Sequence, residues 1–399
     1  MRSKSFYLIL AGTIARGFAH WYLVWIIAYA YDAASLGAYT VLLAGATPIY
    51  VVGSLALREV YVSLDRPPSW RKLLQLRSLG IVASSVALAA YALPLSPGWP
   101  MFIGMVGMKS ADAVLDIISA RVQAAEKFRL LGVLSLGNAV TSVALITILA
   151  LFSAPVSWLL TGTALVSVAF WLPALKYSAN YRESTGQPVN VLAFIFSAAL
   201  PVTISLTGMS LIASVPVWYL ESTATVKEVG IFSAAAYLIV AANMVGASLQ
   251  TIMIPRIRRF QKDGGSKAVL NVLRKGSVKG VAVGAPLIVL IVLLGDPVLK
   301  RVYGPEFGAT DLELLGFGIA ALFCILGYLN SAAVLAVNRY RIQTYSSIVA
   351  VAGACAAALL GTLVPEAYVL PAAAGTLAFA YACRYLTSST LIRIDRERH

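Results

Sequence analysis

Three ionisable residues lie close together in one strongly apolar stretch of the sequence. Lys109, Asp112 and Asp116 belong to "GMKSADAVLDIISARVQ" (107–123), inside a segment that predicts a membrane-spanning helix. Spacings of three and four residues put all three side chains on one face of that helix. Because a charged residue at the bilayer centre costs about 2.5–3.5 kcal/mol on insertion scales, we expect this face to meet protein or water instead of lipid.

A second ionisable pair, Arg16 and His20, is four residues apart on one face of the first predicted span. One interpretation is purely structural: the two cations of these spans balance the two aspartates and join the first span to the fourth. The other is a hydrated cavity for a polar substrate or a coupling ion, since ionisable residues inside a membrane usually mark a transport pathway. We favour the second interpretation.

The residue types suit an anionic ligand. If the ligand carries a phosphate, we expect Arg16 and Lys109 to bind it and His20 to act as an adjustable donor. Asp112 and Asp116 would then orient those cations or take up protons. Secondary candidates are polar residues of later spans: Thr203, Ser205 and Thr207 beside Pro201, and Asn243 and Gln250 seven residues apart on one helix face. For the last two, interhelical hydrogen bonding is the favoured role.

The elements that position these residues are predicted to be membrane helices. Of the 399 residues, 59% are hydrophobic and 12% are charged. Backbone groups in lipid must pair within their own segment, which favours helices. We therefore predict an all-α polytopic membrane protein with about twelve transmembrane helices. The predicted spans are 6–30, 38–57, 78–96, 101–122, 130–153, 155–175, 189–213, 229–254, 280–296, 311–335, 342–362 and 366–388.

Loop charge predicts the topology. Lys and Arg gather in one set of alternate connections, including a loop at 255–279 with eight cations, which places both termini in the cytoplasm. The formal net charge of +14 is explained by this bias, so no nucleic-acid partner is expected. The 255–279 loop suits anionic lipid headgroups, or the gathering of an anionic substrate. We expect a multi-pass protein of the plasma membrane, with lobes 1–178 and 179–399 of six helices each around a central cavity.

Several segments resemble one family. "YDAASLGAYTVL" (31–42), "LALREVYVSLDR" (55–66) and "RVYGPEFGATDLEL" (301–314) are similar to loops and helix ends of polysaccharide flippases. The stretches 109–133 and 214–260 match the same family in order and topology. This family belongs to the multidrug/oligosaccharidyl-lipid/polysaccharide (MOP) exporter superfamily.

The resemblance implies two six-helix lobes and alternating access. It also implies a polyprenyl-phosphate- or pyrophosphate-linked oligosaccharide as cargo, flipped from the cytoplasmic to the outer leaflet for surface polysaccharide or glycoconjugate synthesis. Lys109 and Asp116 match a pattern of the polysaccharide branch, whereas His20 and Asp112 have no counterpart. The partners implied are the lipid-linked glycan, membrane lipids and enzymes of glycan biosynthesis.

Two other functions stay open. An ion-coupled drug or metabolite antiporter of the same superfamily would use Asp112 or Asp116 as a proton or sodium site. A membrane glycan polymerase or ligase would need a long external loop with catalytic Arg or His, but the external loops are short and the second histidine, His399, is in the tail. We therefore expect no enzyme, no catalytic residue, no metal and no cofactor, with coupling to a proton or sodium gradient as the open question.

Overall fold

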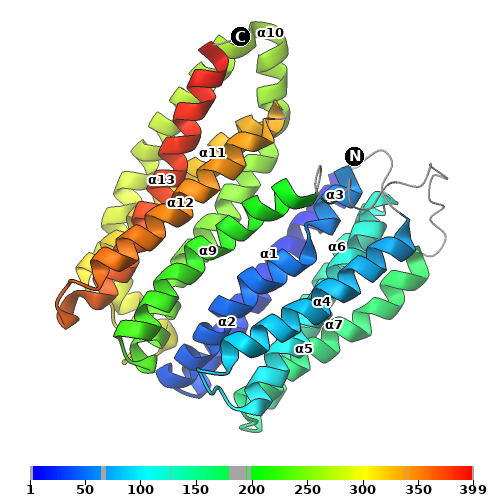
Figure 1. The fold of residues 1–399 in the computed structure, drawn as a ribbon, viewed down its shortest axis with the longest axis vertical. Helices are drawn as coiled ribbons and strands as arrows, with labels where there is room; N and C mark the ends of the chain where they lie inside the picture. The colour runs from blue at the N-terminus through cyan, green and yellow to red at the C-terminus, as the bar shows by residue number, and fades with distance from the viewer. Residues whose placement is uncertain are drawn as a thin grey trace. The chain divides into compact units, whose positions relative to one another are not determined.

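The computed structural model describes residues 3–63, 69–125, 127–178, 195, 199–337 and 339–397, and within these ranges the regular structure is entirely helical (Figure 1). The first helices are α1 (Ser3–Ala30), α2 (Ala33–Ser54), α3 (Leu57–Ser63), α4 (Trp70–Ala92), α5 (Trp99–Ala124), α6 (Phe128–Leu151) and α7 (Val156–Ser178). They are followed by α9 (Leu200–Thr223), α10 (Val226–Tyr303), α11 (Asp311–Ala336), α12 (Tyr340–Gly361), the short 3₁₀ helix η2 (Glu366–Tyr368) and α13 (Val369–Glu397).

The chain forms two compact units, Met1–Thr207 and Gly208–His399. In the first unit α1 packs on α6, α5 packs on α7, and α2 packs on α4. In the second unit α11 packs on α10 and α13, and α13 also packs on α12. The predicted lobe boundary after residue 178 falls where a stretch outside the described residues begins, and it stays a prediction. The start of the predicted span 189–213 also lies outside the described residues.

Ten segments in the described part of the chain are long and apolar enough to cross a membrane. The two long helices that do not meet this standard are α1 and α5, which carry the ionisable residues singled out in the sequence. Every 18-residue stretch of α5 contains Lys109, Asp112 and Asp116, and Arg16 and His20 lower the hydropathy of α1. The predicted all-helical, multi-pass membrane fold is confirmed, and the ionisable residues lie in two helices of full spanning length.

The basic segment 255–279 is helical, so its prediction as a loop was wrong. α10 runs through it and contains two helical segments, Val226–Gln261 and Ala268–Tyr303, which we call the first and second halves of α10. They are separated near Gly265, whose φ of 63° and ψ of −155° are not helical. Hydropathy located only the apolar part of each half, whereas helix formation continues through the cationic residues because Lys and Arg are good helix formers.

Two other predicted boundaries were also wrong. The second span was predicted at 38–57, but α2 ends at Ser54 and a new helix, α3, begins at Leu57. Between them Leu55 and Ala56 both have positive φ, at 49° and 45°, a conformation that turns the chain. The third span was predicted at 78–96, whereas α4 begins at Trp70 and ends at Ala92. Arg77 therefore stands two turns inside a helix and not in the loop before it.

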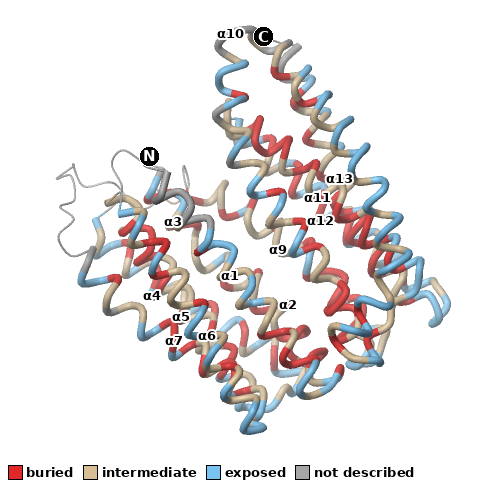
Figure 2. Tube along the Cα trace, turned by 180° about the vertical axis from the view of Figure 1, so that it is seen from behind, coloured by how far each residue is buried: buried red, intermediate tan, exposed pale blue. Residues whose placement is uncertain are grey.

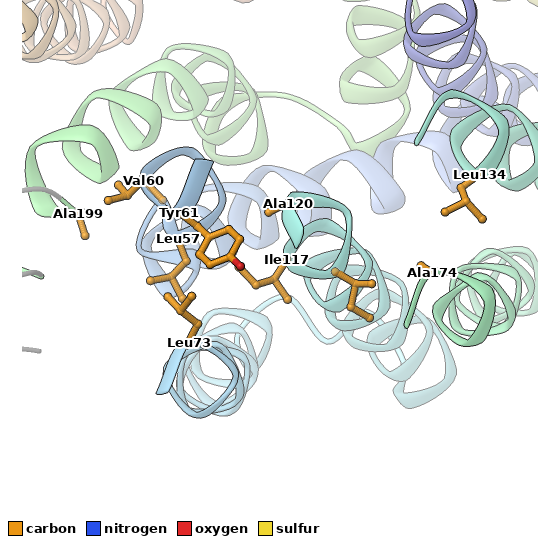
Figure 3. Close-up of a cluster of buried hydrophobic side chains, with 11 residues drawn as sticks. Leu57, Val60, Tyr61, Leu73, Ile117, Ala120, Leu134, Ala174 and Ala199 are labelled. Carbon is orange, nitrogen blue, oxygen red and sulfur yellow. The ribbon is translucent and has the colours of Figure 1, made fainter. Parts of the chain in front are cut away.

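A buried apolar cluster holds the end of the first unit where α3 lies (Figure 3). Leu57 and Tyr61 of α3 pack with Leu73 of α4 and Ile117 of α5, and each is at most 2% exposed. Figure 3 shows the Tyr61 ring directed toward Ile117. This cluster fixes α3, α4 and α5 against one another close to the point where the side chains of Arg58, Arg77 and Asp116 meet.

Glycines allow the second half of α10 to lie close against α11. Gly276, Gly280 and Gly284 recur every fourth residue, and a Cβ atom at each would come within 2.7 Å of a leucine side chain of α11. Small residues at this spacing give two membrane helices a close interface. The other faces of this segment carry exposed valines and leucines, as suits contact with lipid, whereas α11 is buried over much of its length (Figure 2).

Candidate functional site

Helix α5 is the centre of the candidate site in the first unit. Its 26 residues span about 39 Å at 1.5 Å per residue, so Asp112 stands near the midpoint of a membrane crossing. α5 is held close to α7 at Gly104, where a Cβ atom would come within 2.9 Å of the Ser157 carbonyl oxygen. The indole N–H of Trp171 on α7 donates to the carbonyl of Ala111 at 3.2 Å. These contacts fix the rotation of α5, and with it the direction of its charged face.

Asp112 faces hydroxyl and amide groups. The hydroxyl of Ser167 on α7 donates to its Oδ1 at 2.9 Å, and the amide of Asn138 on α6 lies 3.5 Å from the same hydroxyl. Ser167 is only 3% exposed. Among the described residues no cation lies within ion-pair distance of Asp112, and the hydrogen-bond partner of its carboxylate is a neutral hydroxyl.

Arg16 and Lys109 are likewise held by neutral partners. Arg16 of α1 donates to the hydroxyl of Ser135 on α6 at 2.9 Å, and Lys109 donates to the hydroxyl of Thr47 on α2 at 3.2 Å. Both cations are half-buried, and in the described part of the chain neither forms a salt bridge. α1 comes close to α6 because Gly132 has no side chain: a Cβ there would meet the Leu8 backbone at 2.7 Å.

The predicted residues nevertheless share one electrostatic neighbourhood. The charge of Asp112 acts on Arg16, His20 and Lys109, and the two cations also act on His20. His20 is exposed on α1, one turn beyond Arg16. The charge of Asp116 also acts on Arg16, so the structure brings all five residues that the sequence singled out into one electrostatic neighbourhood.

Asp116 belongs to a different arrangement. Its Oδ1 accepts from Nη1 of Arg58 on α3 at 2.7 Å, and its Oδ2 lies 3.4 Å from Nη2 of Arg77 on α4. The second arginine is only 3% exposed, whereas Arg58 and Asp116 are about one-third exposed. Arg58 also donates to the side-chain oxygen of Gln123 at 3.4 Å. We call Arg58, Arg77 and Asp116 the triad; it ties α3, α4 and α5 together beside the apolar cluster of Figure 3.

The triad changes the balance of charge that the sequence suggested. The structural interpretation, which we did not favour, required ion pairs between the cations of the first and fourth spans and the two aspartates. Instead, Asp116 pairs with arginines that sequence reasoning had assigned to cytoplasmic loops, which leaves Arg16 and Lys109 without a carboxylate at ion-pair distance in the described structure. One signal was present in the sequence: Arg58 and Arg77 directly flank predicted spans, where a small change of boundary brings an arginine into the bundle.

The secondary candidates lie in both units, and most of them form hydrogen bonds to other groups of the protein. Thr203 donates to the Ala199 carbonyl of its own chain segment at 2.8 Å. Ser205 is buried, and its hydroxyl has no hydrogen-bond partner in the described structure, while Thr207 is half-buried. In the second unit, Asn243 accepts from the Tyr328 hydroxyl at 3.1 Å, and Gln250 donates to Ser331 at 2.8 Å. The favoured interhelical hydrogen bonds of Asn243 and Gln250 to α11 are therefore present.

These observations define a multi-pass membrane protein with a polar, ionisable centre inside its first helical unit. No protein-family model matches the chain. Its sequence is 24% identical over 324 residues to the capsular polysaccharide biosynthesis protein CapF of Staphylococcus aureus, a match that covers 79% of this chain and 80% of CapF.

Two solved structures have a similar fold. The lipid II flippase MurJ in an inward closed conformation matches with a TM-score of 0.71 and 13% identity, over 97% of this chain and 87% of MurJ. A mutant of the MATE transporter VcmN from Vibrio cholerae matches with a TM-score of 0.67 and 12% identity, over 98% of this chain and 96% of VcmN. The chain therefore has the fold of these transporters, and the fold that the sequence resemblance implied is confirmed.

Proposed function

We propose that the protein is a flippase for a polyprenyl-phosphate- or pyrophosphate-linked oligosaccharide. It moves this lipid from the cytoplasmic to the outer leaflet of the plasma membrane by alternating access, for synthesis of a surface polysaccharide or glycoconjugate. Both termini face the cytoplasm in this proposal, as the loop charges predict. Enzymes that build the glycan would supply the cargo.

One structural observation carries the proposal: Arg16 and Lys109 stand in membrane helices with hydroxyl partners and no ion-paired carboxylate in the described structure. A cation inside a membrane is costly unless its charge is compensated. A phosphate group supplies that compensation, and hydrogen bonds between ionised partners are stronger than the hydroxyl bonds that they replace. The likeness to CapF supports a surface polysaccharide as the pathway, and the fold shared with MurJ supports flipping of a lipid.

The remaining site residues take complementary roles in this proposal. His20 provides a further donor to the phosphate from the next turn of α1. Asp112, which accepts a hydrogen bond from Ser167, keeps the two cations from holding a phosphate too tightly, because its charge opposes that of the phosphate. The triad holds α5 in position and does not contact the cargo.

Deletion of the gene, followed by analysis of lipid-linked sugars, tests the function. Loss of the flippase should make a lipid-linked oligosaccharide accumulate on the cytoplasmic side, and the wild-type gene should reverse the accumulation. In the same strain, Arg16→Gln and Lys109→Gln should each lower export about tenfold or more, because a hydrogen bond to a charged group contributes about 1.5–3 kcal/mol. Membrane levels of each variant are measured in parallel.

Arg129→Gln is the matched control, since Arg129 is an exposed cation at the start of α6. It removes the same charge from the same unit and should leave export unchanged. A deletion strain with unaltered lipid-linked sugars would reject the flippase function. Full export by both the Arg16 and Lys109 variants would reject the role of those two cations.

Asp112 supports a second candidate function, an ion-coupled antiporter. Its carboxylate lies at the middle of a membrane helix and accepts a hydrogen bond from a neutral hydroxyl, which suits a proton or sodium site. In that case Asp112→Asn would abolish efflux of a cationic dye driven by an ion gradient. Dye efflux that does not depend on Asp112, together with accumulated lipid-linked sugars after gene deletion, would exclude the antiporter.

A further inference from the structure

The second unit contains a polar cavity that the residues discussed so far do not use. Its volume is about 580 Å³, within the range of small-molecule pockets, and it is lined by the second half of α10, by α11 and by α13. The buried apolar residues Leu273 and Ile392 belong both to its wall and to an adjoining hydrophobic cluster, so packing holds the wall in place.

Two guanidinium groups give the cavity its charge. Arg274 of α10 and Arg393 of α13 line it from opposite helices, and both side chains are exposed to solvent. No carboxylate is among the described residues that line it. In the described part of the chain neither arginine forms a salt bridge, so the described lining contributes two positive charges.

Two serine hydroxyl groups in the cavity wall are held in place by neighbouring side chains. Ser389 accepts from the amide of Asn330 at 2.7 Å, and Ser277 accepts from the Tyr385 hydroxyl at 2.9 Å. Each of these serine hydroxyls also has a proton that it can donate to a ligand in the cavity. Asn330 is only 2% exposed and also donates to Ser388, so the floor of the cavity is a fixed polar network.

The position of the cavity along α10 matches the headgroup layer of a bilayer. The second half of α10 has 36 residues and is about 54 Å long, whereas the hydrocarbon core is about 30 Å thick. Its strongly apolar part begins near Val281, after the last α10 residue of the cavity, Val278. The cavity therefore lies at the end of the apolar part of this helix, on the side that the loop charges predict to be cytoplasmic.

We propose that this cavity binds the phosphate or pyrophosphate headgroup of a membrane lipid. Two arginines and two hydroxyl donors without a carboxylate are the groups that bind phosphate oxygens, and guanidinium groups do so with two parallel hydrogen bonds. The lipid is either a bilayer phospholipid or the polyprenyl carrier of the cargo, and the second case rests on the proposed function.

Lipid binding by the purified protein in phosphatidylcholine nanodiscs tests the site. Phosphatidylglycerol and a polyprenyl pyrophosphate are added separately, and bound lipid is measured by native mass spectrometry. The double variant Arg274→Gln/Arg393→Gln should bind the phosphate lipid at least about tenfold more weakly, because it removes both cations and their charge-assisted hydrogen bonds. Arg274→Lys/Arg393→Lys keeps the charge but loses paired hydrogen bonding, and should be intermediate.

Arg256→Gln/Arg258→Gln is the matched control, because these exposed arginines lie on the first half of α10, outside the cavity, and carry the same charge. It should weaken binding about twofold or less, as expected for exposed charges. Equal loss in the control and cavity variants would overturn the site and leave only general attraction to the basic surface.

The two lipid sources give different results. Binding of the polyprenyl pyrophosphate alone, with reduced export by the cavity variant in cells, assigns the site to the cargo carrier. Equal binding of phosphatidylglycerol assigns it to the bilayer lipid. Because the phospholipid measurement is independent of export, failure of the flippase proposal would leave this binding result intact, and failure of both lipids to bind would reject the cavity alone.

Discussion

The triad makes a quantitative prediction about stability. Asp116→Asn keeps an oxygen that accepts a hydrogen bond but removes the negative charge between Arg58 and Arg77. Arg77 then becomes a guanidinium group, 3% exposed, without the counter-charge that lies 3.4 Å away in the native protein. An unpaired buried charge destabilises a fold more than the loss of the hydrogen bond itself.

The expected magnitude follows from the burial of the partners. Breaking a buried ion pair costs about 3–5 kcal/mol, and because about one-third of the Asp116 side chain is exposed, we expect about 3 kcal/mol. Asp112→Asn provides a matched comparison on the same helix. It keeps an acceptor for the Ser167 hydroxyl, and no cation loses its partner, so the expected cost is about 1 kcal/mol or less.

Reversible unfolding of the purified protein in mixed micelles, followed by circular dichroism as dodecyl sulfate is increased, measures these free energies. Arg77→Met tests the cause, because it replaces the buried cation by an apolar side chain of similar length. In the Arg77→Met background, Asp116→Asn should cost only about 1 kcal/mol, which is a coupling of about 2 kcal/mol between the two positions.

A result that would refute this reasoning is equal destabilisation by Asp116→Asn in the native and Arg77→Met backgrounds. In that case the carboxylate would stabilise α5 through contacts other than the charge of Arg77. A small effect in both backgrounds would show that solvent screens the triad, as it screens surface ion pairs.

Three further predictions concern the helices themselves, all measured by the same unfolding assay. Gly132→Val should lower the free energy of unfolding by about 1–3 kcal/mol, because its side chain would meet the α1 backbone. Gly107→Ala should have little effect, because the nearest neighbour of its Cβ would be 3.6 Å away. Equal stability of the two variants would contradict the close approach of α1 and α6. Thr310→Val should cost about 1 kcal/mol by removing the capping box with Glu313, and Thr362→Val, at an exposed helix end, should not. Gly265→Ala should destabilise the protein by about 1 kcal/mol because Gly265 has a positive φ. Gly375→Ala should stabilise it by about 0.5–1 kcal/mol, because Gly375 is an ordinary helical position; a Cβ at either glycine would meet no atom within 4 Å. A stability change of the same sign in both variants would refute the assigned break in α10.

The sequence by itself determined the all-helical membrane fold and the identity of the polar centre. Long apolar stretches leave a chain in lipid no alternative to helices, because every backbone group must find a partner within its own segment. The ionisable residues of α1 and α5 were recognisable for the same reason: charges are rare in such segments and stand out against an apolar background. All five, Arg16, His20, Lys109, Asp112 and Asp116, share one electrostatic neighbourhood.

Only the tertiary structure decided which charges pair with each other. Helical periodicity gives the face of a residue on its own helix, but not the helix that packs against that face. Arg58 and Arg77 were read as loop cations because hydropathy marks where apolar residues end, and not where a helix ends. The turn at Leu55 and Ala56 and the early start of α4 bring both arginines to Asp116. The polar cavity of the second unit was equally hidden, since Arg274, Asn330 and Arg393 are far apart in sequence and meet only when α10, α11 and α13 pack together.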